Sequence, residues 1–172
     1  MTAPGTGLPL RAPAHRVDPA ARWLWAASGL AVTVVAAAVV IVLSIVLPDD
    51  TPRWIEVLLA VARWLLVPLG LIAIVIEPLW RYRVHRWEVT EDAVYTLEGW
   101  LTRTWRIVPI SRIQTVDTTR GPLQQLLGLT SIRVRTASHA GSTSIEQLSA
   151  PLAAAVAHDL GLRANQVRDE AT

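Results

Sequence analysis

The chain has 172 residues and contains no Cys and no Lys, so all sixteen strongly basic side chains are Arg. This composition excludes a disulfide framework, a thiolate metal site, a Cys nucleophile and Lys-based Schiff-base or P-loop chemistry. Hydrophobic residues make up 52% of the chain and charged residues 17%, and the mean hydropathy is +0.37. Soluble domains have about 25% charged residues, so the composition predicts a membrane protein.

The charge is unevenly distributed along the chain. Residues 1–23 carry a net charge of +2 and residues 24–80 a net charge of −2, whereas residues 84–172 hold nine Arg and nine acidic side chains. The high pI, about 9.9, therefore comes from the flanks of the apolar segments and not from a basic domain face. A nucleic-acid-binding domain gathers its cations on one face, so no nucleic-acid partner is expected.

The first apolar segment follows a polar leader. Residues 1–22 are rich in Pro, Ala and Gly and lack periodicity, which predicts a disordered cytoplasmic leader. Residues 24–47 contain no charged side chain. About 20 apolar residues cross a bilayer as a helix, whereas a signal peptide has a shorter apolar region of about 7–15 residues. We therefore predict a transmembrane helix over 24–47.

A second apolar segment, 54–79, carries Glu56 and Arg63 in its first half. A charged side chain near the middle of a membrane helix costs about 2.5–3.5 kcal/mol, which the many Leu, Ile and Val side chains offset. Two interpretations of the pair are open. Both side chains reach the same headgroup layer, or they make a buried polar contact with a partner helix. Residues 23–80 together are predicted to be a transmembrane hairpin.

The flanking charges predict the orientation of this hairpin. Six Arg lie at its two outer ends: Arg11, Arg16, Arg22, Arg81, Arg83 and Arg86. The connecting loop, 48–53, has two Asp and one Arg. By the positive-inside rule both termini are cytoplasmic, in a protein that crosses the lipid bilayer more than once. Four Trp fall where interfacial Trp belts are expected: Trp23, Trp25, Trp54 and Trp80.

Residues 84–161 change from continuous apolarity to an alternation of apolar and polar side chains, interrupted by turn signals such as Glu91-Asp92. This pattern predicts six or seven antiparallel strands. Apolar residues then recur every four positions up to Gly161, which predicts a C-terminal amphipathic helix ending there: Leu152, Val156 and Leu160. The predicted fold is α+β, with a small antiparallel β-barrel capped by this helix and a flexible tail over 162–172.

Motifs spread over this domain are similar to those of a known family. They are RWEVTEDAVY at 86–95, EGWLTR at 98–103, VPISRIQTV at 108–116, GPLQQLLGL at 121–129 and IRVRTA at 132–137. Together they resemble the bacterial membrane PH-like family (YdbS-like, bacterial PH domain type 2). The resemblance implies a PH-like barrel over 84–161, located at the bacterial cytoplasmic membrane, and it implies no catalytic site. Gln125 departs from the family, which commonly has a basic residue there.

The residues show no pattern of catalytic or metal-binding chemistry. The four His are not at metal-ligand spacing, and no Gly-x-Ser-x-Gly motif is present. We therefore predict no catalytic residue, no cofactor and no metal ion, and hence no enzyme.

Two groups of residues are candidates for interaction. Five arginines form a modest positive face or an ordinary solvated strand surface: Arg103, Arg106, Arg120, Arg133 and Arg135. The connection after Gly121 brings Leu123, Gln124 and Gln125 together, and its Leu side chains either plug the barrel or dock a partner. The predicted function is a non-enzymatic, membrane-anchored interaction or scaffold module that binds a protein partner or its own copies. The alternatives are an accessory subunit of a transport or export system, with Glu56 and Arg63 contacting other helices, and a lipid-sensing domain.

Overall fold

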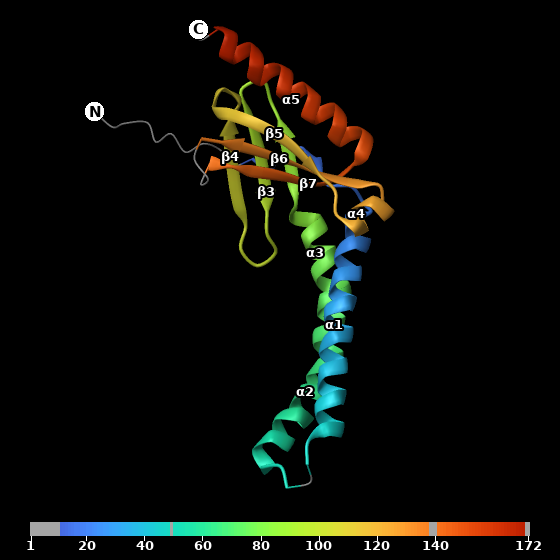
Figure 1. Cartoon of the computed structure of the whole chain (residues 1–172). Helices are drawn as coiled ribbons and strands as arrows, with labels where there is room; N and C mark the ends of the chain where they lie inside the picture. Colours follow the sequence, from blue (N-terminus) through green and yellow to red (C-terminus); the bar gives the residue numbers. More distant parts are fainter. Residues whose placement is uncertain (1–10, 49, 138–140, 171–172) are drawn as a thin grey trace, which may run out of the picture.

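The computed structural model describes residues 11–48, 50–137 and 141–170. Two long helices run side by side away from a folded β-rich domain (Figure 1). The first is α1, Ala21–Val46. The second is continuous from Arg53 to Val84 and consists of α2, Arg53–Leu71, the π-helical turn η1, Ile72–Ile76, and α3, Glu77–Val84.

Both helices are long and apolar enough to cross a membrane. They have 26 and 32 residues, and in the most apolar 18-residue stretch of each helix 0% and 6% of the residues are buried by the rest of the chain. A surface of exposed Val, Leu and Ile on every face is unfavourable in water and favourable in hydrocarbon. The two predicted apolar segments thus form two helices, the second of which runs five residues beyond the predicted end.

Small residues bring the two helices into close contact. An added Cβ at Gly29 would overlap the backbone carbonyl of Ala73, and one at Gly70 would lie 2.8 Å from Cγ2 of Thr33. Ala73 belongs to η1, which follows Pro68 after one turn. Proline has no N–H for the helical hydrogen bond, and a wider π-type turn re-aims the carbonyls nearby. Gly29 provides the space into which such a carbonyl fits.

The domain contains two antiparallel sheets. One has the order β1-β2-β3-β4 and consists of His15–Arg16, Arg86–Val89, Ala93–Glu98 and Thr104–Pro109. The other has the order β5-β6-β7 and consists of Ile113–Thr119, Leu129–Thr136 and Thr143–Ser149. Residues 86–149 form six strands, β2 to β7, in agreement with the six or seven predicted from alternation.

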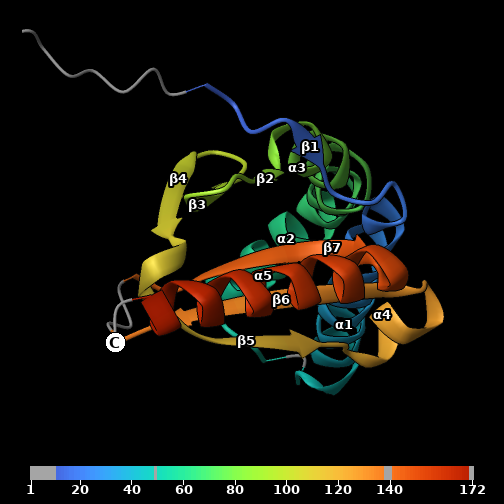
Figure 2. The ribbon, with the colours of Figure 1, turned by 90° about the horizontal axis from the view of Figure 1, so that it is seen from above.

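The two sheets share one core with the C-terminal helix α5, Ala150–Glu170. Figure 2 shows α5 lying across the β5–β6–β7 sheet. Buried apolar side chains come from both sheets and from α5, among them Val94, Ile132 and Leu160. The Thr96 and Thr143 hydroxyls, 2.8 Å apart, join the sheets inside this core.

A closed barrel is not what the structure shows. Among the described residues no ladder joins the two sheets, and the chain passes from β4 to β5 through a 3-10 turn, η2, Ile110–Arg112. Pro109, at the end of β4, has no N–H to continue a ladder. The chain therefore turns a corner there, and the free edges of β4 and β5 remain apart (Figure 2).

Part of the leader is ordered, contrary to the prediction for 1–22. The strand β1 pairs with β2, and the rings of His15 and Trp87 lie 5.0 Å apart. Val17 is buried, and the backbone N–H of Asp18 donates to the carbonyl of Gln147. Polar and Pro-rich segments are disordered when their backbone N–H and C=O groups have no partner in the fold. Here the edge of β2 forms hydrogen bonds with these groups. Residues 1–10 lie outside the described part of the chain.

The C-terminal helix does not end at Gly161 as predicted, and residues 162–170 continue it. Leu160 and Ala164 are both buried on the same face, so the helix gains burial by continuing past the glycine. An ion pair of 2.9 Å between Asp159 and Arg163 also spans this turn. The predicted apolar stripe is partly wrong, because Leu152 is exposed and Ala153 is buried in its place.

Candidate membrane-facing site

The base of the domain, next to the long helices, holds the most distinctive groups of the chain. The β3–β4 hairpin extends down beside α3, as Figure 1 shows. Its turn depends on Gly99, which has a φ of 119° and where an added Cβ would overlap the carbonyl of Thr102. The next-but-one residue, Leu101, is 81% exposed at the tip. The indole N–H of Trp80 donates to the carbonyl of Trp100 over 2.8 Å and holds the tip against α3.

Aromatic and cationic side chains pack where the helices enter the domain. The guanidinium of Arg81 lies 4.7 Å from the ring centre of Trp25, and that of Arg22 lies 4.9 Å from the ring centre of Tyr82. Both distances are within the range of cation–π attraction. Trp25 is therefore buried inside this junction, whereas the sequence placed it in an interfacial belt. The junction fixes the domain on the two helices.

His85 lies in this junction and is buried. Its Nδ1 is 2.9 Å from the carbonyl of Arg81, which can only accept, so Nδ1 carries the proton. Burial lowers the pKa of His85, and the nearby charge of Arg81 acts in the same direction, against the raising effects of the Arg81 carbonyl and of Glu146. His85 is thus a neutral packing residue of the helix–domain junction.

A small cleft opens between α3, β2 and the β3–β4 hairpin. It has a volume of about 390 Å³ and is lined by Ala12, Trp80, Arg83, Val84, Arg86, Leu97 and Arg103. Three arginines thus come together from three different elements. Of the sequence-predicted interaction residues, Arg103 is the one that the structure places here.

The leader lines one side of this cleft with Ala12, and its Arg11 forms an ion pair with Glu88 nearby. The guanidinium of Arg11 lies 2.8 Å from Glu88, and the backbone N–H of Ala14 donates to the same carboxylate over 3.0 Å. The hydrogen bond from Arg11 lowers the pKa of Glu88, with the Ala14 N–H and nearby charges adding to it. Glu88 is thereby occupied and leaves Arg86, two residues before it on β2, without an acidic neighbour on that strand.

A second acid, Glu98, ends β3 on the inner side of the hairpin. Its Oε1 is buried without a hydrogen-bond partner. Burial raises the pKa of Glu98, and the neighbouring Glu146 raises it further, against the opposing charges of Arg106 and Arg81. A group whose pKa is raised on folding stabilises the protein at low pH, and this contribution is lost as the pH rises through the folded-state pKa.

Glu98→Gln is therefore expected to raise the melting temperature at pH 7–8 and to leave it unchanged near pH 4, where Glu98 is protonated. The neutral amide removes a charge that both burial and the neighbouring Glu146 disfavour, and we expect a gain on the order of 1 kcal/mol, or roughly 2–4 °C for a chain of this size. Thermal unfolding of the detergent-solubilised protein across this pH range measures the difference in melting temperature between Glu98→Gln and the unchanged chain. Glu91→Gln, at the exposed β2–β3 turn, is the control and should show no such trend. Equal curves for Glu98→Gln and the unchanged chain would contradict the effect.

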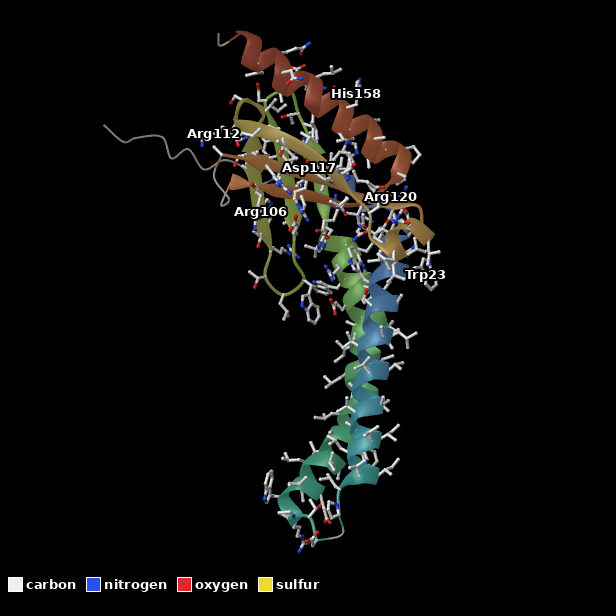
Figure 3. All side chains as sticks on the ribbon, viewed as in Figure 1. Trp23, Arg106, Arg112, Asp117, Arg120 and His158 are labelled. Carbon is white, nitrogen blue, oxygen red and sulfur yellow. The ribbon has the colours of Figure 1, made fainter. Side chains whose placement is uncertain are left out.

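The five predicted arginines do not form one positive face. Figure 3 shows Arg106 and Arg120 on opposite sides of the domain. Arg106 donates to the carbonyl of Ser142 over 3.1 Å, and Arg120 donates to that of Leu129 over 3.1 Å. Arg135 pairs with Asp117 at 3.2 Å, and Arg133 lies opposite Asp117 in the ladder. The side chains of Arg106, Arg120 and Arg135 thus bind their own neighbours in the fold.

The connection after Gly121 forms a short helix, α4, Pro122–Leu126, next to the start of β6. Gln124 is structural, since its amide donates to Ser131 and to buried Gln147 over 2.9 and 3.0 Å. Gln125 is exposed to one side and donates to the carbonyl of Arg120 at 3.5 Å. Leu123 is half-exposed, so the leucines of this connection do not all fill the core.

Glu56 and Arg63 do not pair with each other in the structure, and both are exposed. Arg63 instead donates to the hydroxyl of Ser44 on α1 at 2.5 Å. Ser44 in turn donates to the carbonyl of Val40 over 2.6 Å, so the arginine is tied into the first helix.

The whole unit, from the start of α1 to the buried part of α5, matches a known family. The family model described as Bacterial PH domain matches residues 20–164. The chain belongs to the bacterial PH domain family. It is 30% identical over 127 residues to the UPF0699 transmembrane protein YdbS of Bacillus subtilis (strain 168), which covers 73% of this chain and 78% of that protein. No solved structure matches it.

Several site residues of this bacterial PH domain escaped sequence reasoning. Trp80 was predicted only as an interfacial anchor, Arg83 only as an orienting charge, and Arg86 and Glu98 entered otherwise only as members of the family motifs. The spacing of Arg83 and Arg86 past the apolar segment was a usable signal, because cations there lie at headgroup level. No local signal showed that the hairpin tip at Arg103 returns to α3, since that contact depends on the length and twist of β3 and β4.

Proposed function

We propose that this bacterial PH domain is a non-enzymatic interaction module held against the inner face of the cytoplasmic membrane. In this proposal both long helices span the bilayer, and both chain termini are cytoplasmic. The observation that carries it is the exposed apolar surface of two helices that continue directly into a folded domain. The family supports it, since YdbS is described as a transmembrane protein.

The contacts between the helices support a span of the right length. Trp25 and Arg81 meet at the domain end, and Ser44 and Arg63 meet near the loop end. At 1.5 Å per residue these pairs are about 27–29 Å apart along the two helices, close to the ~30 Å of a hydrocarbon core. Arg63 therefore lies at the outer boundary and not in the middle of the span, so it reaches the outer headgroups at little cost.

The edge of β4 is the surface best suited to a protein partner. Among the described strands β4 pairs with β3 alone, and residues 104–107 are exposed. Trp105 and Ile107 are 36% and 44% exposed there. A free edge with apolar side chains can accept an extended strand of another chain or of a second copy. Holding both partners on one membrane raises their effective concentration.

Photo-crosslinking in native membranes tests this function. A photoreactive amino acid at Ile107 is expected to give one discrete adduct, of twice the chain mass if the partner is a second copy. The same group at Leu162, which is 52% exposed on α5, is the matched control and should give none. No adduct from Ile107, or the same adducts from both positions, would contradict β4 as the interaction surface.

The alternative function, an accessory subunit of a transport or export system, gains no support from the helices. It needs Glu56 and Arg63 to contact foreign helices, whereas Arg63 already binds Ser44 of its own hairpin.

A further inference from the structure

The cleft between α3, β2 and the β3–β4 hairpin has the properties of a small anion site. Its volume of about 390 Å³ falls within the roughly 300–1,000 Å³ typical of ligand pockets. Arg83, Arg86 and Arg103 line it, and none of the acidic side chains that the structure describes does. Guanidinium groups that converge from separate elements repel one another, so the arrangement favours an anion between them.

The positive charge of the cleft is not neutralised within the fold. None of the three arginines lies within 4.0 Å of a carboxylate in the described part of the chain. Two of the nearby acids are already paired, since Glu88 is bound by Arg11 at 2.8 Å and Glu77 by Arg81 at 3.3 Å. A third, Glu98, lies buried on the inner side of the hairpin and does not line the cleft.

The remaining walls of the cleft are apolar. Val84 and Leu97 are buried beside it, and the Trp80 indole uses its N–H on Trp100, so the ring presents a nonpolar face. The cleft lies directly after the apolar part of the second helix, and exposed Leu101 lies at the tip of the adjoining hairpin. A ligand with a phosphate at one end and hydrocarbon at the other matches this order of surfaces.

We propose that this cleft binds the phosphate of an anionic phospholipid from the leaflet next to the domain. This inference rests on the proposed membrane insertion. Guanidinium groups bind phosphate oxygens in pairs of parallel hydrogen bonds, and three of them from three elements would fix the domain at one height and tilt on the membrane. The site differs from the β2–β3 turn, where Glu91 and Asp92 repel an anion.

The test measures lipid binding by native mass spectrometry of the full chain in detergent, with phosphatidylglycerol and, separately, phosphatidylcholine. The unchanged chain is expected to bind phosphatidylglycerol more tightly. Arg83→Gln/Arg86→Gln/Arg103→Gln should weaken that binding by about fivefold per arginine, on the order of 100-fold in total. The control Arg112→Gln/Arg133→Gln/Arg135→Gln removes the same charge from η2 and β6, outside the cleft, and should bind as the unchanged chain does.

A single substitution tests the site in case the triple variant does not fold. Arg103→Glu changes one exposed side chain of the hairpin and is expected to weaken phosphatidylglycerol binding roughly tenfold or more, with an unchanged melting temperature. Equal binding by all variants, or equal loss in the control triple, would overturn the site.

Competition with inorganic phosphate shows whether the cleft binds the phosphate of a lipid or free phosphate. Phosphate that displaces the lipid at equal concentration would overturn the assignment to a lipid, whereas failure to compete supports it. Resistance of the chain to alkaline extraction from membranes is measured in parallel. A chain that is extracted refutes the proposed function, while a membrane-integrated chain whose lipid binding ignores the three arginines refutes this inference alone.

Discussion

Thr33→Cys/Gly70→Cys is expected to form a disulfide between α1 and α2 in nearly every molecule after mild oxidation. A Cβ at Gly70 would lie 3.8 Å from Cβ of Thr33, and disulfides have a mean Cβ separation of about 3.8 Å. The substitution at Thr33 also removes the methyl group that a side chain at position 70 would meet at 2.8 Å. Because the natural chain has no Cys, labelling of the remaining thiols with a maleimide–polyethylene glycol measures the yield without background.

Two further variants show whether the crosslink reports the packing seen here. Ala31→Cys/Gly70→Cys places one thiol on an exposed face of α1 and should remain reduced. Gly29→Val added to the Thr33–Gly70 pair should lower the yield severalfold, because its side chain overlaps the carbonyl of Ala73 in η1. Crosslinking of the Ala31 pair at the same yield would show that the helices do not hold this register.

The helices and strands could be predicted because their signals are local. An uncharged run from residue 24 to 47 is apolar on every face, and strands such as Ile132–Thr136 alternate with period two whatever they pack against. The ends of elements were less predictable. Gly161 looks like a C-terminal cap in the sequence, but the helix continues through it despite the roughly 1 kcal/mol helix cost of a glycine, and both the burial of Ala164 and the Asp159–Arg163 ion pair favour this continuation.

Two features depend on contacts between residues far apart in the chain: the ordered structure of residues 11–20, and the absence of a ladder that would close the two sheets into a barrel. The leader pairs with β2, about 70 residues away in the chain, and nothing in its own composition indicates this partner. A closed barrel and two open sheets have the same pattern of alternation, since closure depends on the corner at Pro109 and on strand twist.

The candidate site was only partly predictable for the same reason. Arg103 was chosen for its charge alone, and its neighbours Arg83 and Arg86 lie some twenty residues earlier in the chain. Gln124 was predicted to face a partner, but the bulge in β6–β7 turns Gln147, with a φ of 57°, toward it. A bulge that re-aims one side chain leaves no clear trace in the sequence.

The C-terminal helix makes the second large prediction. Leu160→Ala is expected to lower the free energy of unfolding by about 2–5 kcal/mol, the usual cost of truncating a buried Leu. Leu160 is fully buried in the core that both sheets share, so α5 closes the side of the domain that the open sheets leave uncovered. Leu162→Ala removes the same atoms from a side chain that is 52% exposed on the same helix and should cost about 0.5 kcal/mol or less.

Thermal unfolding of the full chain in detergent, followed by near-ultraviolet circular dichroism, measures both variants. This signal comes from packed aromatic side chains, which include Trp87 in the domain core and Trp25 at the helix–domain junction, so it reports the packing of the domain and of its junction with the long helices. Each kcal/mol should shift the midpoint by about 2–4 °C. Equal shifts for Leu160→Ala and Leu162→Ala would mean that α5 does not pack on the sheets.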